Sequence, residues 1–268
     1  MSNITDGLTD YFHKHGHGYG LDFGTFRSSM AYHDAGMSSL KTAQYENISI
    51  RNGIPSLFWY NPDNQKEYLC DEVIDRNGLS DDPAGVCTSI KMKLDVPSIT
   101  LHNKTFSSEY IAEQELKRIL SLSHDAFSKE CIPTDYSRLV VGVPVRFGAR
   151  LRQMLKNILV KATNGKEIRL LSEPIAAAIA YSYHTNKELQ KVLVYDLGAG
   201  TFDTVFLLPN NHRTKTEPYP YRAVYPDGID IAGDYFDMQM ANLIINALAK
   251  GNTNLDISKL TDSHCADY

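Results

Sequence analysis

The feature that most constrains the fold is a pattern that occurs twice, at residues 19–34 and again at residues 193–208. Each copy is an apolar run that ends in an aspartate, Asp22 or Asp196, followed by a glycine turn with a threonine and a second strand-like run. Solenoid repeats recur every ~20–50 residues, whereas these copies lie in different halves of the chain. The pattern therefore predicts two related half-domains, each carrying a β-hairpin.

The turns of the two hairpins suit phosphate binding. Gly24 with Thr25, and Gly198 and Gly200 with Thr201, let backbone N–H groups converge without a Cβ in the way. Such a nest of N–H groups holds phosphate oxygens through dipoles. An Asp-x-Gly turn is common in ordinary hairpins, so one copy alone says little. Two matching copies favour a polyphosphate held between two lobes.

Carboxylates accompany both predicted phosphate nests, at Asp22, Asp196 and Asp203. Two like charges ~4 Å apart repel by about 4 kcal/mol at an effective dielectric constant near 20. A hard cation such as Mg²⁺ removes this conflict and keeps several waters when it binds. We therefore expect Asp22 and Asp196 to hold a hydrated Mg²⁺. The alternative is that both aspartates only shape the turns.

Composition places the chain among ordinary globular proteins: 43% of its 268 residues are hydrophobic, 22% are charged, and the net charge is −5. This length allows two lobes with cores of their own. Lysine and arginine are scattered rather than clustered, so no nucleic-acid partner is expected. No apolar run approaches the roughly 18 residues of a membrane span, and the N-terminus lacks the regions of a secretory signal. We expect a cytoplasmic protein without a membrane partner.

Cysteine and histidine spacings indicate neither a disulfide framework nor a strong metal site. Four cysteines lie far apart and are expected to be reduced thiols: Cys70, Cys87, Cys131 and Cys265. Three histidines lie close together near the N-terminus: His13, His15 and His17. No cysteine or carboxylate cluster accompanies them, which favours a glycine-flanked mobile arm over a metal site.

Apolar periodicity and turn residues divide the chain into three parts. Residues 1–17 are interpreted as a flexible leader, residues 18–187 as a first lobe, and residues 188–268 as a partial second lobe. The first lobe carries an insertion at about 40–130, within which residues 60–107 are rich in turns and low in periodicity. The second lobe is expected to expose a sheet edge and apolar surface.

Several elements can be placed from the same signals. A helix capped by Ser107 or Ser108 is expected to run to about Ser128, another spans 148–164, and a third begins near Glu173. A last helix follows Gly233 and carries one apolar face, made of Phe236, Met240, Leu243, Ile244 and Leu248. Strands are expected at 18–22, 28–34, 139–143, 168–171 and 223–225. Strands that alternate with helices predict an α/β architecture.

The motifs together resemble the nucleotide-binding domain of the 70-kDa heat-shock chaperones, within the actin and sugar-kinase superfamily. The string Glu-Pro-x-Ala-Ala-Ala-x-Ala-Tyr at 173–181 and the string Asp-Leu-Gly-x-Gly-Thr-Phe-Asp at 196–203 are highly specific. The likeness runs from about residue 18 to residue 240. Six stretches carry it in the family's order: 21–25, 89–94, 141–153, 170–181, 195–203 and 231–237.

The resemblance implies an actin-like ATPase fold, with ribonuclease H-like lobes of mixed sheets flanked by helices. It implies ATP or ADP as ligand, Mg²⁺ as metal, and client proteins and co-chaperones as partners through a region that this sequence does not include. It places Asp22 and Asp196 on the hydrated metal. The residues that it places on the phosphates are Gly24, Thr25, Gly198, Ala199, Gly200, Thr201 and Gly233.

The resemblance also implies catalytic and relay roles. Lys91 would face the γ-phosphate, and Glu173 or Asp203 would orient the attacking water. Pro144 and Arg152 would couple the nucleotide state to a peptide-binding domain. Simpler readings exist for these residues: Lys91 as a surface lysine, Glu173 as a favourable acid at a helix N-terminus, and Arg152 on the polar side of its helix.

Substitutions at two places and a shortened second lobe depart from the family pattern. Phe26 and Arg27 replace the small hydroxyl residue and the aromatic residue that usually follow the first hairpin threonine, and Arg27 could reach the phosphates or block them. Ala199 replaces the middle glycine of the second turn, which is tolerated if its φ is negative. We expect a nucleotide-binding, chaperone-type ATPase domain with slow hydrolysis. The alternatives are a non-catalytic nucleotide-binding or interaction module of the same fold and an actin-like filament protein.

Overall fold

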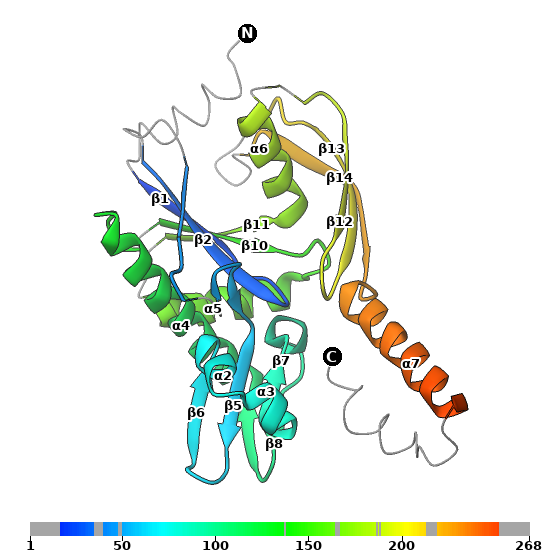
Figure 1. Cartoon of the computed structure of the whole chain (residues 1–268). Coiled ribbons are helices and arrows are strands. Elements are labelled where there is room, and N and C mark those ends of the chain that lie inside the picture. Colours follow the sequence, from blue (N-terminus) through cyan, green and yellow to red (C-terminus); the bar gives the residue numbers. More distant parts are fainter. Residues whose placement is uncertain are drawn as a thin grey trace.

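The first hairpin lies inside the largest sheet of the protein. The computed structural model describes residues 17–34, 40–47, 50–136, 138–163, 167–185, 187, 189–212 and 219–251. Strand β1 (Gly18–Asp22) pairs antiparallel with β2 (Arg27–His33) and parallel with β10 (Arg138–Val143). The sheet continues with β11 (Glu167–Ser172), β3 (Lys41–Thr42) and β4 (Ile54–Pro55), in the order β11-β10-β1-β2-β3 with β4 also on β2. Figure 1 shows this sheet at the centre of the first lobe.

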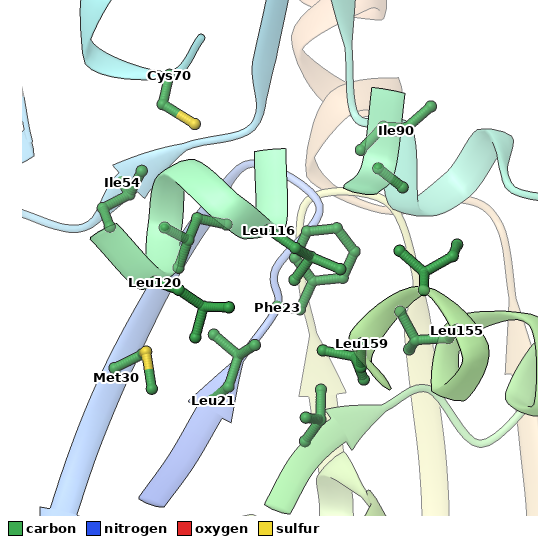
Figure 2. Close-up of a cluster of buried hydrophobic side chains, with 14 of the residues drawn as sticks. Leu21, Phe23, Met30, Ile54, Cys70, Ile90, Leu116, Leu120, Leu155 and Leu159 are labelled. Carbon is green, nitrogen blue, oxygen red and sulfur yellow. The ribbon is translucent and has the colours of Figure 1, made fainter. Parts of the chain in front are cut away.

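Two long helices pack their apolar faces on this sheet. Helix α4 (Ser108–Lys129) begins at the predicted cap, where Ser107 Oγ accepts a hydrogen bond from the Tyr110 amide at 3.1 Å. Helix α5 (Ala149–Thr163) buries Leu155, Ile158 and Leu159. Figure 2 shows side chains of both helices meeting the apolar residues of the first hairpin. Burial of each such side chain contributes about 1.5–3 kcal/mol, so this core anchors the first hairpin.

The turn-rich segment at residues 60–107 folds into short strands and helices. Its own small core consists of Leu57, Trp59, Val73 and Val86. The strands are too short for periodicity to reveal them. The elements are β5 (Leu57–Asn61), β6 (Lys66–Leu69), α2 (Asp71–Asp75), α3 (Gly78–Asp81), η2 (Pro83–Gly85), β7 (Val86–Thr88), η3 (Ile90–Lys93), β8 (Ser98–Leu101) and β9 (Lys104–Ser107).

The second hairpin belongs to a three-stranded antiparallel sheet, in the order β12-β13-β14. Its strands are β12 (Val192–Leu197), β13 (Phe202–Pro209) and β14 (Tyr221–Ile229), the last longer than the predicted 223–225. Helix α6 (Glu173–Thr185) covers one face, where Ala178 packs with Val205, Leu207 and Tyr221. Helix α7 (Gly233–Gly251) leads away from the lower end of this sheet (Figure 1).

The second sheet and α7 leave apolar side chains exposed, as expected from the sequence. All five residues of the predicted apolar face of α7 are exposed: Phe236, Met240, Leu243, Ile244 and Leu248. On β12 the same holds for Leu193, Tyr195 and Leu197. These residues form an apolar surface that no described part of the chain covers.

Several sequence-based expectations fall wholly or partly outside the described residues. These are the leader up to residue 16 with His13 and His15, the end of the second long helix at Asn164 and Gly165, the polar tail at 258–268, and Cys265. His17 is described and lies 3.2 Å from the Asp135 carboxylate. Cys70, Cys87 and Cys131 are free thiols, as predicted.

Candidate functional site

The two aspartate-led hairpins meet. A Cβ built on Gly200, in the turn of the second hairpin, would lie 2.8 Å from Thr25 Cγ2 and 2.8 Å from Met92 Cγ. Real Cβ atoms do not approach other heavy atoms this closely, so glycine at 200 lets the second turn lie against the first hairpin and against η3. The site is therefore assembled from both copies of the repeated pattern and from the short helix that carries Lys91.

Backbone contacts fix the shape of both turns. A Cβ on Gly24 would clash with the Arg27 carbonyl, and the Gly24 amide donates a hydrogen bond to Ser28 Oγ at 3.2 Å. In the second turn, the Gly198 amide donates to the Thr201 carbonyl at 2.9 Å.

The start of α7 holds the second turn from the other side. The amide of Gly233 donates to the Gly198 carbonyl at 3.0 Å, and the amide of Asp234 donates to the Ala199 carbonyl at 2.9 Å. Ala199 is not among the described non-glycine residues with positive φ, so alanine is accommodated there without backbone strain. The departure from glycine at this position leaves the turn intact.

A buried ion pair joins η3 to the start of α6. Lys91 Nζ donates to Glu173 Oε1 at 2.5 Å, and the Lys91 side chain is only 3% exposed. Lys91 comes from η3 and Glu173 is the first residue of α6. Beneath Glu173, a Cβ on Gly142 would lie 3.2 Å from Glu173 Cγ, so β10 passes close under the carboxylate. The reading of Lys91 as a solvated surface lysine is wrong, because its side chain is buried. The pairing with Glu173 is needed because burying an unpaired ammonium would be strongly unfavourable.

The carboxylates of both hairpins share one electrostatic environment. Burial raises the pKa of Asp22, the Lys91 charge lowers it, and the Asp196 charge raises it further. Burial likewise raises the pKa of Glu173. The Lys91 charge and hydrogen bond lower this pKa, and the charges of Asp22 and Asp196 raise it. For Asp203, burial raises the pKa, a hydrogen bond from Thr201 lowers it, and Asp196 raises it. The four carboxylates, with one ammonium among them, make a site that favours a cation.

The carboxylates of the site fit a hydrated metal ion. Among the described residues, no group of three or more His, Cys, Asp or Glu side chains could together hold a metal ion. Asp203 Oδ1 is buried and lacks a hydrogen-bond partner. Mg²⁺ keeps several of its waters and needs only one or two carboxylates, which Asp22 and Asp196 can supply.

Arg27 makes contacts within the first lobe. Its Nη1 donates to the Gly53 carbonyl at 2.8 Å, and its guanidinium lies 5.3 Å from the centre of the Phe26 ring. The contact with phosphate that the sequence suggests for Arg27 stays a prediction.

Arg152 and Pro144 are in contact with each other and electrostatically linked to the site. Arg152 Nε donates to the Phe147 carbonyl at 2.6 Å, and Nη2 donates to the Pro144 carbonyl at 3.4 Å. Burial lowers the pKa of Arg152 and the Glu173 charge raises it. The half-buried guanidinium folds back onto the loop before α5.

Two neighbours of the site were not predicted from the sequence. Met92 packs against the Gly200 turn, and Arg146 Nη1 forms a 2.7 Å ion pair with Asp230 at the end of β14. The Arg146 stem and Asp203 Oδ1 both lie against Gly228, where a Cβ would clash with that oxygen. Only the position of Met92 beside Lys91 and of Arg146 after Pro144 could have indicated them, since neither residue type marks phosphate chemistry.

Comparisons with known proteins identify similar sequences. The family model described as Hsp70 protein matches residues 83–263. The chaperone protein DnaK of Ureaplasma urealyticum is 30% identical over 241 residues, covering 90% of this chain and 36% of that protein. The chaperone protein HscA of Buchnera aphidicola is 28% identical over 262 residues, covering 90% of this chain and 47% of that protein.

The chain thus spans less than half the length of these curated relatives. Within the part of the chain that the structure describes, no helix is both long and apolar enough to cross a bilayer.

Proposed function

The chain belongs to the Hsp70 protein family, and on that premise we propose that it binds ATP or ADP with Mg²⁺ where its two hairpins meet. The observation that carries the proposal is the approach of Gly200 to Thr25 and Met92. This approach supports the proposal, because a single polyphosphate would then contact both glycine turns. The amides of Gly24 and Gly198 bond within the turns, so other amides of the two turns would hold the phosphate oxygens, with Thr25 and Thr201 adding hydroxyl donors.

Each charged residue then has a separate task. Asp22 and Asp196 would hold the hydrated Mg²⁺, which neutralises charge on the phosphates when bound. Lys91, fixed by its hydrogen bond to Glu173, would direct its ammonium toward the transferred phosphoryl group. Glu173 or Asp203, whose pKa values are both raised mainly by burial, would orient the attacking water and accept its proton.

The wider role of an Hsp70 chaperone is also part of the proposal. Nucleotide binding would control the capture and release of client proteins, with co-chaperones as further partners. Pro144 and Arg152 would couple the nucleotide state to client binding, because Arg152 donates a hydrogen bond to the Pro144 carbonyl and interacts electrostatically with Glu173. Free thiols at Cys70, Cys87 and Cys131 accord with a cytoplasmic setting.

Calorimetric titration with ATP and Mg²⁺ tests the binding step. We expect saturable binding that Lys91→Ala leaves measurable, because the hairpin amides hold the phosphates. No heat of binding at millimolar nucleotide would defeat the proposal.

Phosphate release tests hydrolysis. Lys91→Ala should lower the rate by about 10²-fold or more, because a positioned charge or acid–base group contributes that much to turnover. Lys117→Ala is the matched control, since Lys117 also pairs with a glutamate but on the surface of α4, 2.6 Å from Glu113. Equal rates in the wild type and Lys91→Ala would instead favour a nucleotide-binding module without turnover.

A further inference from the structure

One fully buried carboxyl group has no part in the proposed mechanism. Glu115 lies on α4, and its side chain is 0% exposed. Its Oε2 accepts a hydrogen bond from Ser56 Oγ at 2.9 Å, while Oε1 lacks a partner among the described residues. A carboxyl group in this position is costly to bury, so its single hydrogen bond is the contact to explain.

The partner of Glu115 is a backbone junction. Ser56 lies between β4 and β5 and is buried. Its amide donates to the Phe26 carbonyl at 2.9 Å, and its carbonyl accepts from the Ser89 amide at 3.3 Å. Phe26 directly follows Thr25 of the first hairpin, and Ser89 directly precedes η3. One residue is thus bonded to both segments that bring Thr25 and Lys91 to the site.

The start of η3 depends on such support. Ser89 has a left-handed backbone with φ 54° and makes no side-chain cap to the helix. A non-glycine residue in this conformation is strained by roughly 1–2 kcal/mol and needs surrounding contacts to keep it. Because η3 has only one turn, its direction and the position of Lys91 follow from how Ser89 is held.

We propose that Glu115 is a positioning residue for the nucleotide site, acting through Ser56 to fix the first hairpin and η3 relative to each other. The structural role concerns Ser56 and Ser89 alone, whereas its meaning for nucleotide binding rests on the proposed function. Burial raises the pKa of Glu115 to about 8, with the Ser56 hydrogen bond and the Lys93 charge opposing the rise. The group therefore serves as a neutral acid at pH 7, which an uncharged amide can imitate.

Hydrogen exchange at the amides of Ser56 and Ser89 tests this in three variants. Ser56→Ala and Glu115→Leu both remove the side-chain hydrogen bond, and Ser56→Ala does so with little change in volume. We expect exchange at these two amides to quicken by about tenfold in both variants, as the loss of one hydrogen bond would cause. Glu115→Gln keeps an acceptor for Ser56 Oγ and should restore wild-type exchange. Glu113→Gln, on the exposed side of the same helix, is the control.

Amides of β10 separate positioning from general loss of stability. Unchanged exchange in β10, with faster exchange at Ser56 and Ser89, supports the proposal. Equal acceleration in β10, no acceleration at either serine, or failure of Glu115→Gln to restore exchange overturns it. The ATP dissociation constant should rise about tenfold in Ser56→Ala and Glu115→Leu alone. If the wild-type protein binds no ATP, the proposed function fails, while the exchange experiment still decides the role of Glu115.

Discussion

The two copies of the hairpin have the same local pattern and opposite surroundings. In the first, Leu21 and Met30 are buried between the sheet and α4, together with Phe23 just beyond β1. In the second, Leu193, Tyr195 and Leu197 of β12 are 58%, 70% and 54% exposed. Both copies nevertheless form the same Asp-led antiparallel pair. The turn chemistry thus fixes the hairpin, and tertiary packing decides how firmly it is held.

The two hairpins that form the site are therefore supported by hydrophobic cores of different size. The first hairpin packs on the large core that α4 and α5 complete, whereas the second packs on α6 and a few residues of β13 and β14. The exposed stripe of α7 adds apolar surface on the same side of the molecule as the second sheet (Figure 1).

The largest expected difference between the two regions is in hydrogen exchange. Strands β1 and β13 are both paired on two sides, so their amides are equally hydrogen-bonded. Because β13 rests on the smaller core, we expect β1 amides to exchange roughly 10²–10³-fold more slowly, as local opening free energies differ across a structure. Exchange measured by NMR or mass spectrometry without nucleotide gives the ratio. Equal protection would mean that the two lobes unfold as one unit and would break the comparison.

A pair of leucine truncations tests the same contrast by stability. Leu116→Ala empties a fully buried position of α4 and should cost about 2–5 kcal/mol. Leu243→Ala changes a residue of α7 that is 65% exposed and should shift stability by no more than about 0.5 kcal/mol. Urea unfolding followed by fluorescence measures both. A large loss in Leu243→Ala would show that the α7 stripe is packed in solution, against the arrangement described above.

Glu115 gives the first lobe a pH dependence that can be isolated. Its folded-state pKa of about 8 lies above the usual 4.5, so the folded protein binds an extra proton between these values. The contribution of Glu115 to the free energy of unfolding is therefore greatest below pH 4.5. It falls as the pH rises toward 8, by up to about 1.4 kcal/mol per pH unit. Asp22, Glu173 and Asp203, whose pKa values are also raised, contribute in the same direction.

Glu115→Gln should remove this contribution and leave the others. Urea unfolding at several pH values between 5 and 8 should give a shallower slope in the variant than in the wild type. Parallel slopes would mean that Glu115 is ionised in the folded protein at pH 7, and the assignment of a neutral acid would then be wrong. Glu113→Gln, next to Lys117 on the helix surface, should leave the slope unchanged.

How much the sequence predicts depends on the reach of each contact. Helix α4 with its cap, helix α5 and both hairpins follow from periodicity and turn residues that are close in sequence. The short strands of residues 57–107 were not predicted, because a run of three to five residues shows no clear periodicity. The Lys91–Glu173 pair could be anticipated only through the family resemblance. The Ser56–Glu115 bond and the packing of Met92 could not, because they join segments that only the tertiary fold brings together.

A small effect is expected from the ion pair that joins the two regions directly. Arg146 of the first lobe and Asp230 beside β14 are 2.7 Å apart, with side chains 43% and 58% exposed. Exposed ion pairs contribute about 0–1 kcal/mol, since water screens them and both side chains lose freedom. Asp230→Asn should therefore lower stability by less than about 1 kcal/mol in urea unfolding, and the small effect should shrink further in high salt. A larger loss of stability that salt does not reduce would mean that the two lobes depend on this ion pair. The second hairpin would then be held in place by the first lobe rather than by its own core.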